Sequence, residues 1–345
     1  MSGLASADTL LEQRGVSQSL EAFVVAAAFD RTGCAAFALG DGSLRLAAPG
    51  ETEWRRVDAH DGAVLALCGD AGESGFLSGG DDGAFRRIGG DGALSDLATF
   101  GMKWVEQVAS FGDGKTRLRA CAVGKRVHLH DGDGAALKTL EHPSTVTGMV
   151  FDARGKRIAT SHYNGASVWF VASKSDNPRK LEWKGSHTGI AISPDGDAVV
   201  TAMQENALHG WRLSDGQHMR MSGYPSKTKS LSFTKNGKWL ASSGAESVVM
   251  WPFFGGGPMG RAPKELAGGD RVTCTMVACH PQHEAVAAGF SDGLVVLADI
   301  PGERVLPVCA PGRGPVSALA WSADGATLAF GTETGFAALV DFSKR

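Results

Sequence analysis

Four residues around position 280 are of the types that bind zinc. Cys279, His280 and His283 lie close together, and Cys274 lies five residues before Cys279. Cys and His side chains are common zinc ligands. The stretch nevertheless aligns with residues 192–196, an ordinary turn between two predicted strands. Cys274 and Cys279 are also separated by an odd number of residues, so a regular strand places them on opposite faces. We therefore expect neither a metal nor another cofactor, and keep a metal-handling function as an alternative.

The remaining histidines have spacings that favour structural roles. His60, His142 and His187 each precede the first strand of a different sequence repeat, too far apart for one metal ion. His128 and His130 alternate with apolar residues on one predicted strand, so they point the same way and could chelate a metal. No third ligand accompanies them in the sequence, and we expect them to be structural or exposed histidines.

Motifs of known catalytic classes are missing from the sequence. Asp81 and Asp82 could bind calcium or serve acid–base catalysis, but they precede Gly83 in a predicted turn, where Asp accepts backbone hydrogen bonds. There is no nucleophile elbow, phosphate loop, zinc-protease helix or dinucleotide fingerprint. The three glycines at 255–257 precede a proline rather than a helix, so they cannot cradle a phosphate. We predict that the protein is not an enzyme.

A repeated unit must position these residues. Each copy has an alternating apolar run, a tight turn and a second apolar run of small residues, which is typical of two antiparallel strands. The turns are spaced by 39 to 46 residues and fall at positions 33, 72, 114, 155, 196, 237, 283 and 325. A period of about 40 to 45 residues is typical of propeller blades.

A third strand follows in every repeat. A second turn, such as Asp41-Gly42, precedes it, because Gly readily adopts the positive φ that such turns need. The predicted third strands are Ser43–Ala47, Ala84–Ile88, Arg126–His130, Ala166–Phe170, Leu208–Trp211, Val248–Trp251, Leu294–Ala298 and Phe336–Val340. We therefore predict an all-β fold, a single eight-bladed β-propeller of four-stranded antiparallel blades over residues 1–345, with seven blades as the alternative.

The last blade lacks an outer strand of its own. The sequence given ends at Arg345, five residues after the last predicted third strand. Residues 1–23 precede the first inner strand and are the natural donor of the missing strand. Such an N-terminal closing strand would leave no open sheet edge. Residues 252–263 lengthen the sixth repeat and are predicted to form a flexible loop between strands.

The repeats resemble those of the WD-repeat β-propeller family. Residues 192–196 (Ile-Ser-Pro-Asp-Gly) and 233–237 (Phe-Thr-Lys-Asn-Gly) match the family's first turn, and the resemblance covers nearly the whole chain. Trp169, Trp211 and Trp251 hold the family's namesake Trp position. The resemblance implies that a His before the first strand ties the loop to its own blade. The Ala- and Gly-rich, Tyr-poor composition favours a bacterial member.

The family's structural His-Ser-Asp-Trp set is incomplete in this sequence. The second repeat has His60, Ser78 and Asp82, but Ile88 stands where the set requires Trp. No repeat that we can align contains all four residues. The blade assignment therefore rests on the period and the turns rather than on this set.

Loops expected on one face of the propeller supply the candidate binding residues. In this architecture the loops leading into first strands and those joining second to third strands gather around the channel mouth. The residues placed there are Lys103, Trp104, His162, Tyr163, Gln204, Glu205, Tyr224, Lys227, Lys229, Arg271 and Arg313. Aromatic and Arg side chains on such a rim are typical anchors of protein interfaces.

A propeller is a platform whose shape does not choose its ligand. From these residues we predict a non-enzymatic scaffold or adaptor that binds a partner protein or peptide on this loop-rich face. An enzyme with a site at the central channel is the second alternative, after metal handling.

Composition limits the expected partners and location. With 34 Lys and Arg against 37 Asp and Glu, the formal net charge is −3, which gives no overall attraction to nucleic acid or an anionic membrane. The first residues lack the pattern of a signal peptide, and no apolar run reaches the ~20 residues that cross a bilayer. Six scattered cysteines favour reduced thiols. We expect a cytoplasmic monomer that binds neither membrane nor nucleic acid.

Overall fold

Antiparallel sheets make up nearly all of the fold. The computed structural model describes residues 9–343 except residues 176 and 270. The described residues form thirty strands and one short helix, and the strands pair into seven sheets. Six sheets have four strands and one has six. The prediction of an all-β propeller built from four-stranded antiparallel sheets is therefore confirmed.

The chain divides into two compact units, Val25–Ile192 and Ser193–Arg345, the latter joined by the N-terminal residues up to Val24. Three four-stranded sheets lie within the described part of residues 24–141, each in chain order. Their strands are β2 (Val24–Phe29), β3 (Ala35–Leu39), β4 (Ser43–Ala47) and β5 (Arg55–Asp58); β6 (Val64–Gly69), β7 (Phe76–Gly80), β8 (Ala84–Ile88) and β9 (Leu94–Thr99); and β10 (Gln107–Gly112), β11 (Arg117–Val123), β12 (Arg126–Asp131) and β13 (Ala136–Glu141).

Three more four-stranded sheets lie in the other compact unit. Two of them are β20 (Leu231–Phe233), β21 (Trp239–Ser242), β22 (Val248–Pro252) and β23 (Lys264–Leu266); and β24 (Cys274–Cys279), β25 (Ala285–Phe290), β26 (Val295–Asp299) and β27 (Val305–Cys309). The third contains β28 (Val316–Trp321), β29 (Thr327–Thr332), β30 (Phe336–Asp341) and, from the N-terminal segment, β1 (Gly15–Ser19).

The expectation of eight separate blades is wrong, because the described residues form seven sheets. The fourth and fifth repeats share one six-stranded sheet, with strands β14 (Gly148–Phe151), β15 (Arg157–Phe170), β16 (Arg179–Ile192), β17 (Ala198–Met203), β18 (Ala207–Arg212) and β19 (His218–Met221). β15 runs through the expected turn at Asn164 as one strand of 14 residues, with an irregular register between Tyr163 and Gly165. β16 is equally long and joins an expected outer strand to the next inner strand without a break.

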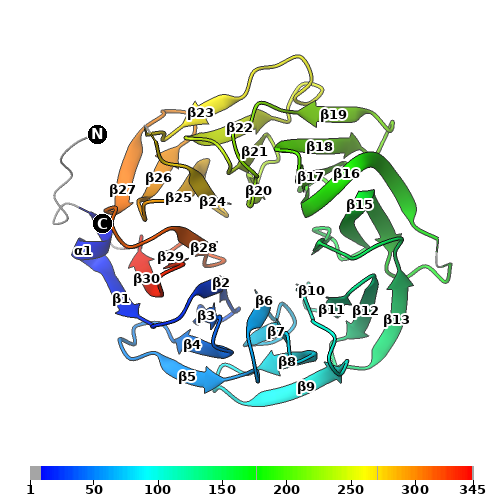
Figure 1. The fold of residues 1–345 in the computed structure, drawn as a ribbon, viewed down its shortest axis with the longest axis horizontal. Helices are drawn as coiled ribbons and strands as arrows, with labels where there is room; N and C mark the ends of the chain where they lie inside the picture. The colour runs from blue at the N-terminus through cyan, green and yellow to red at the C-terminus, as the bar shows by residue number, and fades with distance from the viewer. Residues whose placement is uncertain (1–8, 176, 270, 344–345) are drawn as a thin grey trace. The chain divides into compact units, whose positions relative to one another are not determined.

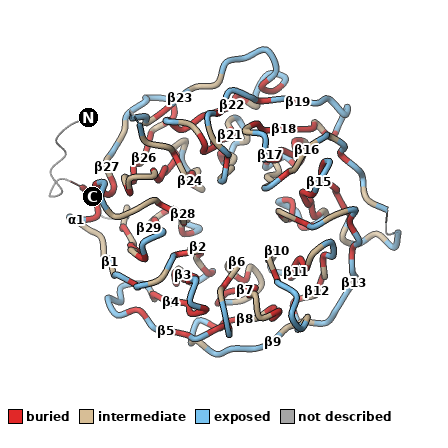
Figure 2. The backbone as a smooth tube through the Cα atoms, viewed as in Figure 1, coloured by how far each residue is buried: buried red, intermediate tan, exposed pale blue. Residues whose placement is uncertain are grey.

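The predicted third strands agree closely with the structure. Seven of them match a strand to within one residue at each end, and Ala166–Phe170 forms the second half of β15. Every residue of the second strands β3, β7 and β17 is buried, whereas the outer strands β9 and β13 are largely exposed (Figure 2). The core therefore follows the middle strands, and side chains that could meet a partner lie on the outer strands and loops.

The N-terminal segment supplies the fourth strand of the last sheet. β1 pairs antiparallel with β30 over five residue pairs, with Val16 opposite Leu339 (Figure 1). Before β1, the helix α1 (Leu10–Arg14) buries Leu10 and Leu11 in an apolar cluster with Val308, Phe330 and Val340. Residues 1–8 of the predicted closing segment lie outside the described residues. That the whole chain is a single domain, and that residues 252–263 are flexible, remain predictions.

Candidate functional site

Trp104 lies at the edge of a groove in the unit Val25–Ile192. Its loop follows β9 and is held at both ends, because the Phe100 N–H donates to the Gly83 carbonyl (2.8 Å) and the Val105 N–H to the Gly80 carbonyl (3.0 Å). Val105 is fully buried, whereas the Trp104 side chain is 58% exposed. The backbone of the loop is thus anchored, while the indole of Trp104 is exposed.

Gly83 is required at the turn that receives this loop. Its φ of +78° lies in the left-handed region, and a Cβ there would clash with the Gly101 carbonyl oxygen. The groove beside Trp104 has a volume of about 640 Å³. Its charged lining residues are Lys103, Glu106, Lys125 and Arg126.

Tyr163 lies in a second groove, of about 920 Å³, in the same unit. It is 58% exposed, and its backbone N–H donates to the Ser144 hydroxyl (2.9 Å). Trp183 of β16 lines the same groove, together with Lys180 and Lys184. The register of β15 is irregular between Tyr163 and Gly165, and Tyr163 is exposed while its neighbour His162 is buried.

One ion pair links the two grooves. Arg126 lines the Trp104 groove and Glu141 lines the Tyr163 groove, and their side chains meet at 2.5 Å. Lys125 adds a longer contact to Glu141 at 4.0 Å. The hydrogen bond from Arg126 holds the pKa of the Glu141 carboxyl below its usual range. Trp104 and Tyr163 therefore belong to neighbouring grooves that the Arg126–Glu141 ion pair joins.

Buried histidines support the floor of the Tyr163 groove. His162 donates from Nδ1 to the Tyr163 carbonyl (2.9 Å) and accepts the Ser167 hydroxyl at Nε2 (2.9 Å). His142 accepts the Trp169 indole N–H at Nε2 (3.0 Å). Burial, together with the charge that His162 would carry, lowers the pKa of His142 to about 4, and burial also lowers the pKa of His162. Both rings are therefore neutral near pH 7 and fix the groove rather than bind in it.

Two Ser–His pairs have the hydrogen bonds of a nucleophile and its base. Besides Ser167 and His162, the Ser78 hydroxyl lies 2.8 Å from His60 Nε2, and Asp82 lies 2.9 Å from His60 Nδ1. Both hydroxyls are buried, Ser78 completely. A nucleophile must reach its substrate, so these contacts are structural. The predicted structural role of His60 is confirmed.

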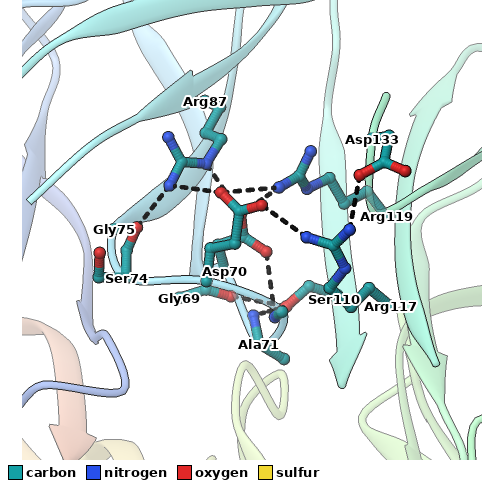
Figure 3. A network of polar contacts seen from close by, with 12 residues as sticks. Gly69, Asp70, Ala71, Ser74, Gly75, Arg87, Ser110, Arg117, Arg119 and Asp133 are labelled. Carbon is teal, nitrogen blue, oxygen red and sulfur yellow. Dashed lines mark hydrogen bonds and ion pairs between the residues drawn. The ribbon is translucent and has the colours of Figure 1, made fainter. Parts of the chain in front are cut away.

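A buried charge network has a structural role as well. Asp70 is almost completely buried and accepts from Arg119 Nη2 (2.7 Å) and Arg87 Nε (3.1 Å) (Figure 3). Arg117 bonds Asp133 at 2.5 Å in the same network (Figure 3). These charges pair with one another and link the turn after β6 to β8 and β11, and β11 to the turn after β12, so they hold sheets together rather than form a binding site.

The predicted site residues fall into sets that lie in different units. The structure brings Lys103 and Trp104 to one groove and His162 and Tyr163 to its neighbour. Of the two aromatic residues predicted at these positions, Trp104 and Tyr163, both are 58% exposed. His162 is buried, so the expectation that it faces a partner is wrong. The other predicted residues lie in the unit that contains Ser193–Arg345.

In that unit, a turn and a loop with predicted site residues meet. Gln204 and Glu205 are exposed in the turn between β17 and β18, and Asn206 Nδ2 donates to the Pro225 carbonyl (3.4 Å). The loop with Pro225 also carries Lys227, Lys229 and Tyr224. Lys227 and Lys229 are exposed, and so is Arg271, in the loop before β24.

Arg313 is tied down within the same unit. Its guanidinium pairs with Glu12 at 2.8 Å and lies over the Phe336 ring at 4.5 Å. These contacts link the loop before β28 to the helix α1 and to β30. Arg313 is half-buried, so its arrangement favours a structural role in holding the N-terminal segment.

Tyr224 is a correction to the predicted binding face, because it is only 8% exposed. Its hydroxyl accepts the Trp251 indole N–H (2.6 Å) and lies 2.5 Å from the Ser242 hydroxyl. Burial raises the pKa of Tyr224 to about 12. Tyr224 thus occupies, in its own repeat, the position before the inner strand that His60 occupies in the second repeat. Ser242 and Trp251, at the family's Ser and Trp positions, were the signal for this role.

Three of the four residues of the zinc alternative, Cys274, Cys279 and His280, bond backbone carbonyls. The Cys279 thiol donates to the Ser232 carbonyl (3.2 Å), and His280 donates to the Gly325 carbonyl (3.1 Å). Burial raises the pKa of both Cys274 and Cys279 to about 12, whereas zinc binds the thiolate. Within the described part of the chain, no three His, Cys, Asp or Glu side chains are placed to hold a metal.

Comparisons with known proteins support the fold. No family model matches the chain. Over 117 residues it is 30% identical to the WD repeat-containing protein slp1 of Schizosaccharomyces pombe, and this match covers 32% of the chain and 24% of slp1. The chain thus matches about a quarter of the length of that relative.

A solved structure of similar fold covers almost the whole chain. The crystal structure of the computationally designed Ika8 protein superposes with a TM-score of 0.74 at 19% identity, over 94% of this chain and 98% of that one. The two comparisons support a WD-like β-propeller. Among the described residues, no helix is long and apolar enough to cross a membrane.

Proposed function

We propose that this protein is a non-enzymatic scaffold or adaptor, and that a partner protein or peptide binds across the two grooves beside Trp104 and Tyr163. One observation carries the proposal. Two aromatic side chains, each 58% exposed, lie in neighbouring grooves that the Arg126–Glu141 ion pair joins. Large aromatic side chains beside a concave surface are typical centres of binding energy in protein interfaces.

The surroundings of the two aromatic residues support this function. Hydrogen bonds hold the backbone at both residues. Val105, next to Trp104, donates its N–H to a carbonyl, and the Tyr163 N–H donates to the Ser144 hydroxyl. An anchored side chain loses little conformational freedom on binding, which favours affinity. The likeness to slp1 adds support, since WD-repeat propellers generally bind protein partners. For Gln204, Glu205, Lys227, Lys229, Arg271 and Arg313, contact with the partner remains a prediction.

Affinity capture with matched variants tests the proposal. The tagged protein captures partners from its source cells, in parallel with a Trp104→Ala/Tyr163→Ala double variant. The control is Phe170→Ala, which removes an aromatic side chain that is 57% exposed and lies outside both grooves. We expect the double variant to lose a partner that the wild type and the control retain, with unchanged circular dichroism. Retention by all three proteins would contradict the proposal.

A further inference from the structure

Charge is distributed unevenly along the unit Val25–Ile192. Residues 25–100 contain 12 Asp and Glu against 6 Lys and Arg, a formal charge of −6. Residues 101–192 contain 14 Lys and Arg against 8 Asp and Glu, a formal charge of +6. All charged residues that line the Trp104 and Tyr163 grooves belong to the second, basic segment. The near-neutral total of the chain hides this separation.

Several of the groove lysines have no counterion among the described residues. Lys103, Lys180 and Lys184 line the grooves, and none of them forms an ion pair with a described residue. By contrast, the Glu141 carboxylate is already neutralised by Arg126 and Lys125. In all, five basic residues line the two grooves against three acidic ones, Glu106, Glu141 and Glu182. The surface around the exposed aromatic residues is therefore electropositive.

The neighbouring groove has the opposite charge. It has a volume of about 530 Å³ and is lined by Asp58, Asp61 and Asp96 against Arg86. β9 connects the two regions, because Asp96 lies within it and the Trp104 groove begins just after it, at Phe100. A long polyanion that ran from one groove into the next would meet these carboxylates. A short anionic segment confined to the basic grooves would not.

We infer that the partner segment is a short acidic peptide, rich in Asp and Glu, whose large apolar side chains pack against Trp104 and Tyr163. This inference rests on the proposed function. Carboxylates would meet the ammonium groups of Lys103, Lys180 and Lys184, which pair with no described residue, and charge complementarity of this kind sets both specificity and association rate. Nucleic acid fits less well, because two exposed aromatic residues make too short a stacking track.

Selection from a phage-displayed library of random 12-residue peptides tests this inference. We expect the selected peptides to be enriched in Asp and Glu beside aromatic or aliphatic residues. Their dissociation constants are then measured by fluorescence polarisation on the wild type and on a Lys180→Glu/Lys184→Glu variant. The charge reversal should weaken binding at least tenfold, and raising the salt from 50 to 500 mM should weaken binding to the wild type.

The matched control is Lys115→Glu/Lys174→Glu. It changes the charge of the same basic segment by the same amount, at two exposed lysines outside both grooves, and it should bind nearly as well as the wild type. Equal weakening by both double variants would overturn the inference, since it would show an effect of overall charge only. Tight, groove-dependent binding of a 12-nucleotide polyuridine probe would overturn it in favour of nucleic acid.

Two failures can be told apart. If the selected peptides are neutral or basic but lose affinity in Trp104→Ala/Tyr163→Ala, the acidic-peptide inference fails and the proposed function stands. If no selected peptide depends on Trp104 or Tyr163, the proposed function fails as well.

Discussion

Replacing Leu11 by Ala should destabilise the protein by removing the anchor of its N-terminal segment. Leu11 is 4% exposed and packs with Val308, Phe330 and Val340. The helix α1 has only five residues, and a helix this short cannot persist without packing. β1 follows it directly and supplies all the strand pairing on the free edge of β30.

The expected cost follows from the burial of the side chain. Truncation of a buried Leu to Ala typically lowers the free energy of unfolding by about 2–5 kcal/mol, because apolar transfer energy is lost and a cavity remains. Leu11 belongs in the upper part of this range if the helix detaches, because Leu10, which is 5% exposed, then loses its packing too. The pairing of β1 with β30 should weaken in the same variant.

Urea unfolding followed by circular dichroism measures the change in free energy, and amide hydrogen exchange of β30 (Phe336–Asp341) reports the strand pairing. The control is Leu306→Ala in β27, where the side chain is 45% exposed, and it should cost less than about 1 kcal/mol. Faster exchange in β30 should accompany the loss of stability in Leu11→Ala only. Equal unfolding midpoints for Leu11→Ala and wild type would refute the argument that the N-terminal segment holds the last sheet together.

Three further perturbations test buried polar groups. The free energy of unfolding should fall by up to about 3 kcal/mol as the pH drops from 6.5 to about 4. In this range His142 binds a proton in the unfolded chain, whereas the buried ring of the folded protein stays neutral because its pKa is lowered. In the acid titration of His142→Gln, this part of the loss should be missing. Tyr224→Phe should cost about 1–3 kcal/mol in urea unfolding, since the buried Trp251 indole loses its acceptor. Arg119→Met should cost about 3 kcal/mol in the same assay, because Asp70 stays buried with one Arg partner fewer.

Each of the three predictions for His142, Tyr224 and Arg119 can be contradicted. An acid titration of His142→Gln that matches that of the wild type would mean that His142 does not titrate as argued. A stable Tyr224→Phe protein would show that Trp251 finds another acceptor. Arg304, whose side chain is 86% exposed, is the control for Arg119, and equal costs at the two positions would rule out a special role for the buried pair.

The repeat pattern predicted the strands well because hairpin turns leave a clear mark in the sequence. Gly42 and Gly83 adopt φ of +85° and +78°, which few residues other than Gly adopt readily, so the turns before third strands could be read directly. The count of sheets could not be read in the same way. Nothing in the residues between Arg179 and Ile192 shows that an outer strand continues into the next inner strand.

The candidate site was predicted only in part. Trp104 and Tyr163 lie at positions where the family resemblance predicts loops of one face, and both are exposed, although Tyr163 belongs to the strand β15. Tyr224 lies in a similar loop but is buried, because its hydroxyl bonds Ser242 and Trp251, which depends on tertiary packing. Lys180 and Lys184 were missed, because an exposed outer strand has no distinctive pattern and its neighbours appear only in the folded protein.

Site-specific photo-cross-linking tests the central claim most directly. A benzophenone-bearing amino acid replaces Trp104, Tyr163 or, as a control, Phe170, three positions with exposed fractions of 57–58%. After irradiation in the source cells, positions 104 and 163 should cross-link to the same partner, at an acidic segment, and position 170 should not. Cross-links of equal yield from all three positions, or different proteins cross-linked at 104 and 163, would contradict the account.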